Sequence, residues 1–199
     1  MLLGDSHAAH YYSALEELIY EDETLSQVTA SGCNPLLPYS GAKRCAGLNK
    51  WAYEELIKEK HFDIIILSGH WFNINKENFQ YSLNQLLKYT DRLVVFGPSM
   101  VYKQSVPRLL LNLKKDEDSS QIYKSAGSYE KLASVDKAMK SYVKMDNAKF
   151  ISTLDTLCDV DGCTTITVNG TPINIDNGHL SHEGALYILE QVEKEIFER

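Results

Sequence analysis

The chain has 199 residues, of which 44% are hydrophobic and 24% are charged, a composition typical of one soluble globular domain. Its 20 basic and 27 acidic side chains give a formal net charge of −7, so phosphodiesters would be repelled and nucleic acid is not an expected partner. The longest aliphatic run, residues 64–67, is far shorter than the ~20 apolar residues that cross a bilayer, so no membrane insertion by this chain is expected.

Apolar runs and helical patterns alternate along the chain. Strands are predicted at residues 1–3, 25–30, 63–68, 93–96 and 150–152. Helices are predicted at residues 8–20, 47–60, 78–89, 129–143 and 181–197, the last with Ser181 as its N-cap. The run 64–67 does not alternate with polar residues, which is typical of strands covered on both faces. The pattern predicts an α/β fold, a three-layer sandwich around a mostly parallel sheet, in a single domain over residues 1–199.

Two segments depart from this alternation. Residues 164–168 and 171–175 flank Asn169-Gly170, a dipeptide that favours a type I′ turn, and are interpreted as a short hairpin leading to Asp176. Residues 98–128 are long and polar, and a surface loop is favoured there over a substrate lid.

The first candidate for chemistry is Ser6, in Gly4-Asp5-Ser6-His7. It follows the first predicted strand directly and precedes a predicted helix. Open α/β sheets place their ligands at such strand ends, and the N–H groups of a helix N-terminus favour a developing anion. A serine nucleophile at this position would be well placed.

A serine needs a base, normally a histidine that is oriented by a third group. Asp176 and His179, three residues apart in a predicted loop, supply both groups. The alternative is structural, with Ser6 as a helix N-cap and Asp176 as a turn residue, and these residues alone do not decide between the two interpretations.

The histidines and cysteines are further candidates for binding or structural roles. His7, His10, His179 and His182 form two pairs at helical spacing, but no Asp, Glu or Cys stands at a recognised ligand spacing, so no metal and no cofactor are expected. His70 is interpreted as a packing residue and His182 as a solvent-facing or capping residue. The four cysteines fall in two local pairs, which permits disulfides without proving them.

Gly-Asp-Ser-His near the start and Asp-x-x-His-Leu-Ser near the end resemble the first and last sequence blocks of the SGNH hydrolase superfamily. The resemblance implies a flavodoxin-like α/β fold and esterase or acyltransferase chemistry. It implies that Ser6 is the nucleophile, His179 the base and Asp176 the residue that orients the base.

The same resemblance implies an oxyanion hole that includes the N–H groups of Ser6 and of Gly32. Its third donor, an asparagine in the family, is not in place, because Ser68-Gly69-His70-Trp71 has tryptophan where asparagine is expected. Trp71 or Asn73 is the expected substitute, and a tryptophan of the core is the alternative.

A narrower resemblance is to the SGNH domain joined to membrane acyltransferases of the acyltransferase-3 family, which O-acetylate bacterial surface polysaccharides. It is carried by Ser-Gly-Cys before prolines, a third block with Trp, Gly97-Pro98 and the closing His-Leu-Ser-His-Glu-Gly-Ala. It implies acetyl transfer from an acyl donor to a glycan acceptor, beside a membrane acyltransferase domain of a longer parent protein. It also implies a location in the periplasm or on the outer side of the cytoplasmic membrane, and hence disulfides Cys33–Cys45 and Cys158–Cys163.

Two other functions stay open. Water in place of the glycan would make the domain a carbohydrate or lipid esterase with the same residues. A domain that keeps the fold with a weakened oxyanion hole would be a non-catalytic glycan-binding module.

Overall fold

The computed structural model describes residues 1–198 and contains one five-stranded sheet in the order β2-β1-β3-β4-β5, with every neighbouring pair parallel. The strands are β1 (Leu2–Gly4), β2 (Gln27–Thr29), β3 (Phe62–Ser68), β4 (Thr90–Phe96) and β5 (Ala148–Ile151). All five predicted strands are confirmed. The order is that of the flavodoxin-like fold, in which the strand order reverses between β1 and β3.

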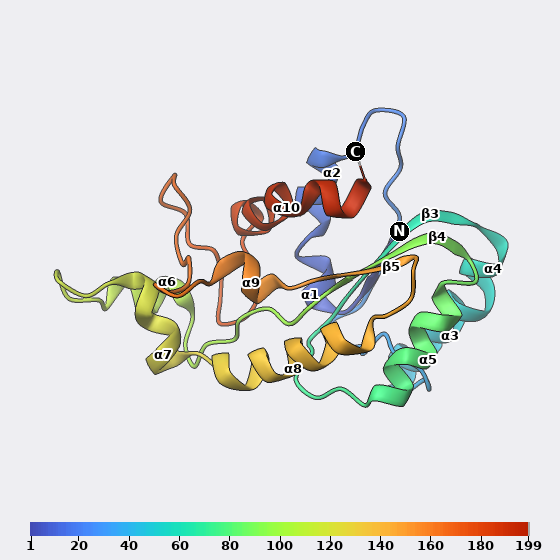
Figure 1. Ribbon diagram of the computed structural model, residues 1–199, viewed down its shortest axis with the longest axis horizontal. Helices are drawn as coiled ribbons and strands as arrows, with labels where there is room; N and C mark the ends of the chain where they lie inside the picture. The colour runs from blue at the N-terminus through green and yellow to red at the C-terminus, as the bar shows by residue number, and fades with distance from the viewer. Residues whose placement is uncertain (199) are drawn as a thin grey trace.

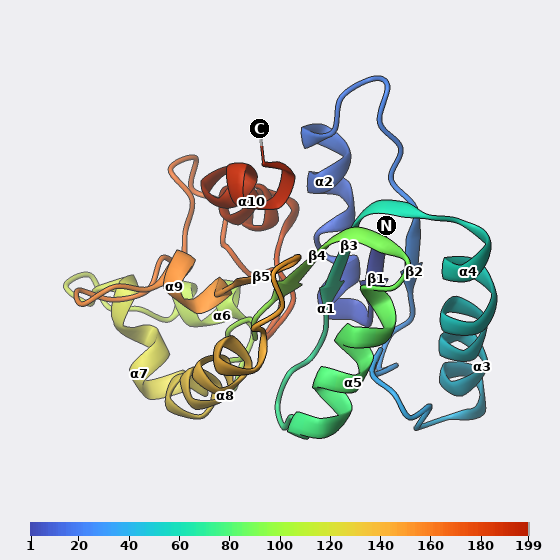
Figure 2. The same ribbon diagram turned by 45° about the vertical axis from the view of Figure 1, so that its right-hand side comes forward.

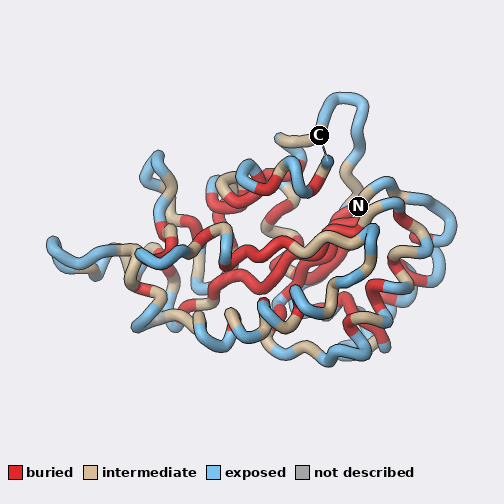
Figure 3. Tube along the Cα trace, viewed as in Figure 1, coloured by how far each residue is buried: buried red, intermediate tan, exposed pale blue. Residues whose placement is uncertain are grey.

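Helices cover both faces of the sheet (Figures 1 and 2). One face packs on α1 (Ser6–Ala9), α2 (Tyr12–Leu18) and α10 (His182–Phe197). The other face packs on α3 (Lys43–Trp51), its continuation η1 (Ala52–Leu56) and α4 (Ile57–Glu59), and on α5 (Lys76–Leu86) and α8 (Tyr129–Tyr142). The central strands β1, β3 and β4 form the buried centre of the molecule (Figure 3). The predicted three-layer sandwich is therefore confirmed.

Neighbouring residues of the strands face opposite helical layers. Ile65 and Leu67 belong to the core on the α5 side, whereas Ile66 belongs to the core on the α10 side. All three side chains are at most 3% exposed. The apolar run without alternation thus follows from a strand that is covered on both faces.

The helices differ from prediction in their continuity. The predicted helix over residues 8–20 is divided at His10 and Tyr11 into α1 and α2. The predicted helix over residues 47–60 begins earlier and passes through one π-helical segment, η1. The N-cap of α10 is confirmed, because Ser181 Oγ accepts a hydrogen bond from the N–H of Gly184 at 3.0 Å.

The polar segment over residues 98–128 is not a plain loop. It contains α6 (Val106–Leu111), the 3₁₀ turn η2 (Ser119–Gln121) and α7 (Ile122–Ala126). Met100, Tyr102, Val106 and Ile122 are buried in a third apolar cluster beside the main cores. The sequence interpretation was wrong here because these apolar residues are too widely spaced to form a periodic pattern.

The predicted hairpin is present only in reduced form. Ile166 and Pro172 form one isolated antiparallel bridge, and Gly170 has φ +85°. Within residues 1–198 the one non-glycine residue with positive φ is Glu198, so Asn169 is not left-handed and the predicted type I′ turn is wrong.

Both predicted disulfides are confirmed. Cys33–Cys45 joins the loop after β2 to α3. Cys158–Cys163 follows α9 (Thr153–Leu157). No helix within residues 1–198 combines the length and the apolar character that a membrane crossing requires.

Candidate active site

Ser6 is held where β1 meets α1, at the carboxyl edge of the sheet. The carboxylate of Asp5, the N-cap of α1, accepts the N–H of His7 at 2.8 Å and the N–H of His70 at 2.8 Å. One buried side chain therefore ties the start of α1 to the segment after β3. Burial raises the pKa of Asp5, although the hydrogen bonds from His70 and His7 act to lower it. The position lies between β1 and β3, where open α/β sheets place their ligands.

A close approach of backbone to backbone fixes the same junction. A Cβ added to Gly4 would lie 1.9 Å from the carbonyl oxygen of Ser68 and 2.6 Å from Cβ of Ala8. Only glycine permits β1, α1 and the end of β3 to meet this closely.

Three side chains from opposite ends of the chain form one hydrogen-bonded series. Ser6 Oγ lies 2.8 Å from His179 Nε2, and His179 Nδ1 lies 2.7 Å from Asp176 Oδ2. The Ser6 hydroxyl can donate to Nε2 while the Nδ1–H group donates to the carboxylate. This is the arrangement by which a histidine removes the proton of a serine nucleophile.

The carboxylate of Asp176 is fixed by its own loop. Its Oδ1 accepts the N–H groups of Gly178 at 2.8 Å and His179 at 2.7 Å. Desolvation acts to raise the pKa of Asp176, but the backbone hydrogen bonds and the His179 imidazole outweigh it, so this pKa lies below its ordinary value. The carboxylate is ionised at neutral pH and can orient and stabilise an imidazolium.

The segment over residues 98–128 forms hydrogen bonds to the backbone of the loop that carries Asp176. The N–H of Tyr102 donates to the carbonyl of Asn177 at 2.7 Å, and the N–H of Val106 donates to that of Asp176 at 3.0 Å. A part of the chain for which a surface loop is predicted thus positions Asp176, whose carboxylate bonds to the imidazole of His179.

Ser6 opens into a pocket of about 290 Å³. Gly32, Ser31, His70, Val101 and His179 line it together with Ser6 and its neighbours. Gly32 has φ +69°, a conformation that favours glycine. Within residues 1–198, the N–H groups of Ser6 and Gly32 have no hydrogen-bond acceptor, so both are available to a ligand.

Trp71 and Asn73, the two expected third donors, are not among the described residues that line this pocket. Trp71 is 2% exposed, and its one side-chain N–H donates to the carbonyl of Phe96 at 2.7 Å. Asn73 is exposed and borders a different hollow beside Asn34 and Asn78. The tryptophan is a core residue, and the side chain after β3 that reaches the pocket is that of His70.

Four imidazoles gather around the site. The ring of His7 lies 4.9 Å from that of His179, 4.8 Å from that of His70 and 5.5 Å from that of His10, between centroids. Burial lowers the pKa of His7 to about 3 and that of His10 well below its ordinary value. His7 and His10 are therefore neutral, and His179 alone combines a carboxylate partner with the serine.

Sequence reasoning missed the place of His70 and the packing role of His7. The available signal was their position, because His7 directly follows Ser6 and His70 lies two residues after β3. His182 lies apart from Ser6, where its ring nitrogens contact Ser13 Oγ and Glu17 Oε1, both at 2.9 Å, and link α10 to α2. No group of three His, Cys, Asp or Glu side chains within residues 1–198 is arranged to hold a metal ion.

Comparison with known proteins gives two matches. The family model described as the SGNH domain fused to AT3 domains matches residues 1–194. The periplasmic domain of a lipopolysaccharide acetyltransferase from Salmonella ser. Paratyphi A is similar in structure, with a TM-score of 0.81. The alignment covers 98% of this chain and 82% of that chain at 20% sequence identity, and at this identity it shows a shared fold. No curated protein sequence matches the chain. Because the family model covers nearly all of it, the chain belongs to the family of SGNH domains that are fused to AT3 domains.

Proposed function

We propose that this domain transfers an acetyl group, through an ester on Ser6, to a hydroxyl group of a bacterial surface polysaccharide. The observation that carries the proposal is the hydrogen-bonded series Ser6–His179–Asp176, which lies beside the N–H groups of Ser6 and Gly32, both without an acceptor within residues 1–198. Membership of a family fused to membrane acyltransferase domains supports an enzyme of this class. The structural similarity to a lipopolysaccharide acetyltransferase domain supports the same polysaccharide chemistry.

The first half of the reaction forms the acyl-enzyme. Ser6 Oγ attacks the carbonyl carbon of the acyl donor and passes its proton to His179 Nε2, while Asp176 stabilises the imidazolium. The N–H groups of Ser6 and Gly32 receive the negative charge that develops on the carbonyl oxygen. The bond to the leaving group then breaks, the leaving group takes the proton from His179, and the acetyl ester of Ser6 remains.

The second half reverses these roles. A sugar hydroxyl attacks the acetyl ester and gives its proton to His179, the tetrahedral intermediate collapses, and Ser6 leaves with that proton. The products are the O-acetylated sugar and the free serine, so no oxidant, metal or cofactor takes part in the scheme.

Hydrolysis is the second candidate, and the exposure of the site favours it. The side chains of His179 and Asp176 are 37% and 44% exposed. Water can therefore reach the ester of Ser6, and without a bound acceptor the same residues act as an esterase.

We place the domain on the outer side of the cytoplasmic membrane, as part of a longer protein with a membrane acyltransferase domain. The description of the family supports this arrangement. The two disulfides support an oxidising compartment, because intracellular thiols are generally kept reduced.

The test is the substitution Ser6→Ala, assayed with p-nitrophenyl acetate. Loss of the nucleophile is expected to lower kcat by at least about 10³-fold. Ser141→Ala is the matched control, because Ser141 is exposed on α8 and its hydroxyl donates to the carbonyl of Ala138, and it is expected to leave the rate unchanged. Circular dichroism of both variants verifies the fold.

A serine-directed phosphonate gives a second measurement. Labelling of Ser6, located by peptide mass spectrometry, is the expected result. Hydrolysis by Ser6→Ala at the rate of the unmodified chain would contradict the proposal, and so would an unlabelled Ser6 in a chain that still binds glycan.

A further inference from the structure

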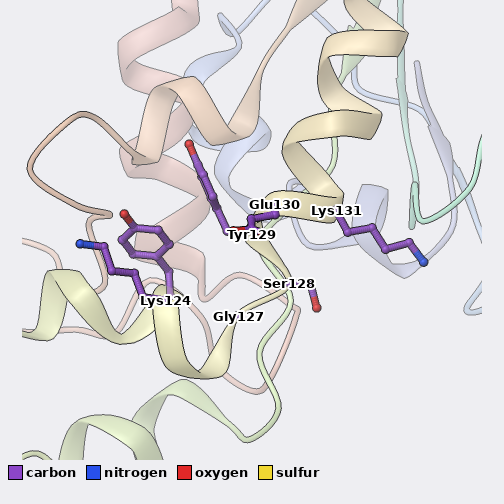
Figure 4. A pocket seen from close by; sticks show the side chains of 7 residues that line it. Lys124, Gly127, Ser128, Tyr129, Glu130 and Lys131 are labelled. Carbon is purple, nitrogen blue, oxygen red and sulfur yellow. The ribbon is translucent and has the colours of Figure 1, made fainter.

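A hollow of about 700 Å³ lies outside the Ser6 pocket, between α7 and the start of α8 (Figure 4). Tyr123 and Lys124 come from α7, and Tyr129, Glu130 and Lys131 come from α8. The two tyrosine rings are half-buried and meet edge to face, with centroids 5.0 Å apart. The wall therefore offers aromatic faces beside hydroxyl, carboxylate and ammonium groups.

A tight corner at Gly127 creates this hollow. The N–H of Gly127 donates to the carbonyl of Tyr123 at 2.9 Å, where α7 ends. A Cβ on Gly127 would lie 2.7 Å from that same carbonyl oxygen, so only glycine lets the chain turn here. The corner brings the end of α7 against the first residues of α8 and sets the two tyrosines side by side.

The hollow adjoins the Ser6 pocket by two independent connections. Ser128 lines the hollow, and its N–H donates to the carbonyl of Val101, which lines the Ser6 pocket, at 2.9 Å. Lys131 also lines the hollow, and its Nζ lies 3.7 Å from the ring centroid of Phe72. Phe72 in turn stacks on His70 of the Ser6 pocket, with centroids 5.3 Å apart.

The Ser6 pocket and the second hollow differ in volume. The Ser6 pocket, at about 290 Å³, is at the small end of ligand pockets, whereas the second hollow is well within the usual range. An acetyl group and the hydroxyl that receives it can use the smaller space. The remainder of a polymeric acceptor must lie on the surface next to it.

The chemistry of the wall fits a sugar. A pyranose ring presents an apolar face of C–H groups and an edge of hydroxyl groups. A tyrosine offers a rigid apolar face with a polar tip, and Glu130, Lys124 and Ser128 supply acceptors and donors for hydroxyl groups. We propose that this hollow binds a saccharide unit of the acceptor glycan, next to the unit whose hydroxyl is acetylated at Ser6. The inference rests on the proposed acetyl transfer and adds an acceptor subsite to it.

The test separates formation of the acyl-enzyme from its capture by a sugar. Purified chain is incubated with p-nitrophenyl acetate and, in parallel, with added maltotriose or chitotriose as probe acceptors. Release of nitrophenolate without sugar measures the chemistry at Ser6, and mass spectrometry measures the acetylated trisaccharide. Tyr129→Ala is expected to leave nitrophenolate release within about twofold while lowering acetyl transfer about tenfold or more, as for loss of a buried aromatic anchor.

Two further variants control for folding and for surface tyrosines in general. Tyr129→Phe retains the ring and is expected to keep most of the transfer. Tyr81→Ala removes a tyrosine that is 55% exposed on α5 and is expected to change neither rate.

Acetyl transfer at an unchanged rate in Tyr129→Ala would overturn the subsite. It would also be overturned if the unmodified chain released nitrophenolate but acetylated neither trisaccharide. An equal loss in Tyr81→Ala would also overturn it. Failure of the proposed function is a different result, namely nitrophenolate release that persists in Ser6→Ala.

Discussion

At the scale of single residues, the partners of each histidine decide its chemistry. His7, His10 and His179 lie together, yet only His179 has a carboxylate on Nδ1 and a hydroxyl on Nε2. Within residues 1–198, Nδ1 of His7 and Nε2 of His10 are buried without a hydrogen-bond partner. Two neutral rings, that of buried His7 and that of half-buried His10, thus lie against the ring of His179.

His7 is expected to make the native state sensitive to acid. Its pKa of about 3 in the folded chain is lowered from 6.5 by burial, so between these pH values the unfolded chain binds one more proton. The free energy of unfolding must therefore fall as the pH drops from about 6.5 towards 3. Asp5 and Asp136, whose pKa values are raised by burial, act in the opposite direction.

Comparison of a His7 variant with the unmodified chain separates the effect of His7 on the free energy of unfolding from the effects of Asp5 and Asp136. His7→Gln is expected to reduce the loss of stability between pH 7 and pH 4 by about 3 kcal/mol, at 1.4 kcal/mol for each unit of pKa. Urea unfolding of both proteins at both pH values measures it. Equal losses of unfolding free energy in the unmodified chain and in His7→Gln would show that His7 is protonated in the folded chain as readily as in the unfolded one.

The limit of sequence reasoning is also clearest at single residues. Ser6, Asp176 and His179 were candidates from their chemistry and their places beside predicted elements, but only the resemblance of both motifs to the SGNH blocks favoured a catalytic role over a structural one. The role of Trp71 was predicted incorrectly, because two neighbouring residues after a strand can lie in different places, one in the pocket and the next in the core. His70 lies in the pocket and Trp71 bonds to Phe96, and no local pattern distinguishes these two outcomes.

At the scale of elements, strands were easier to predict than helix continuity. A buried parallel strand is recognisable from its aliphatic run alone, as in β3 and β4. The apolar stripe of a helix tells which face is buried, but it does not report an interruption of the hydrogen-bond ladder. The break between α1 and α2 and the π-helical η1 therefore escaped prediction, and so did the small core formed by residues around α6 and α7.

The junction of β1, α1 and β3 gives a prediction at this scale. Gly4→Ala would place a Cβ against the carbonyl oxygen of Ser68, so a loss of about 3 kcal/mol or more in unfolding free energy is expected, with loss of esterase activity. Gly47→Ala is the matched control. Gly47 is exposed within α3 with no atom within 4 Å of the added Cβ, and this change is expected to stabilise the chain by about 0.5–1 kcal/mol.

Urea unfolding curves of the two alanine variants measure both effects. Equal unfolding midpoints would mean that the end of β3 can move away from Gly4. The proposed rigid placement of Ser6 would then be incorrect.

At the scale of the whole molecule, the sheet order places the site and two cross-links brace the regions next to it. Ser6 lies where the strand order reverses, an outcome implied by a flavodoxin-like fold but not readable from any one segment. Cys33–Cys45 closes the loop that begins at Gly32, and Cys158–Cys163 closes the turn after α9. The pairing agrees with the sequence because both pairs are local.

Removal of each cross-link is expected to have a different consequence. The separations of 12 and 5 residues predict losses of about 3 kcal/mol for Cys33→Ser/Cys45→Ser and about 2 kcal/mol for Cys158→Ser/Cys163→Ser. Only the first pair holds the loop of Gly32, so only that double variant is expected to lower kcat with p-nitrophenyl acetate. Urea unfolding and initial rates measure the two effects, and equal rates in both double variants would exclude a role for the cross-link in placing Gly32.

The separation of 173 residues between Ser6 and His179 has a consequence for the timing of biosynthesis. In a chain that is made from its amino end, Ser6 is added before Asp176 and His179, and until they are in place it is as unreactive as any other alcohol. Asp176 and His179 are added together, and they meet Ser6 only after the sheet has formed and α10 has docked on α2. If Ser6 is the nucleophile as proposed, a nascent or misfolded chain is expected not to consume the acyl donor, and labelling of Ser6 by a serine-directed phosphonate would report that folding has reached completion.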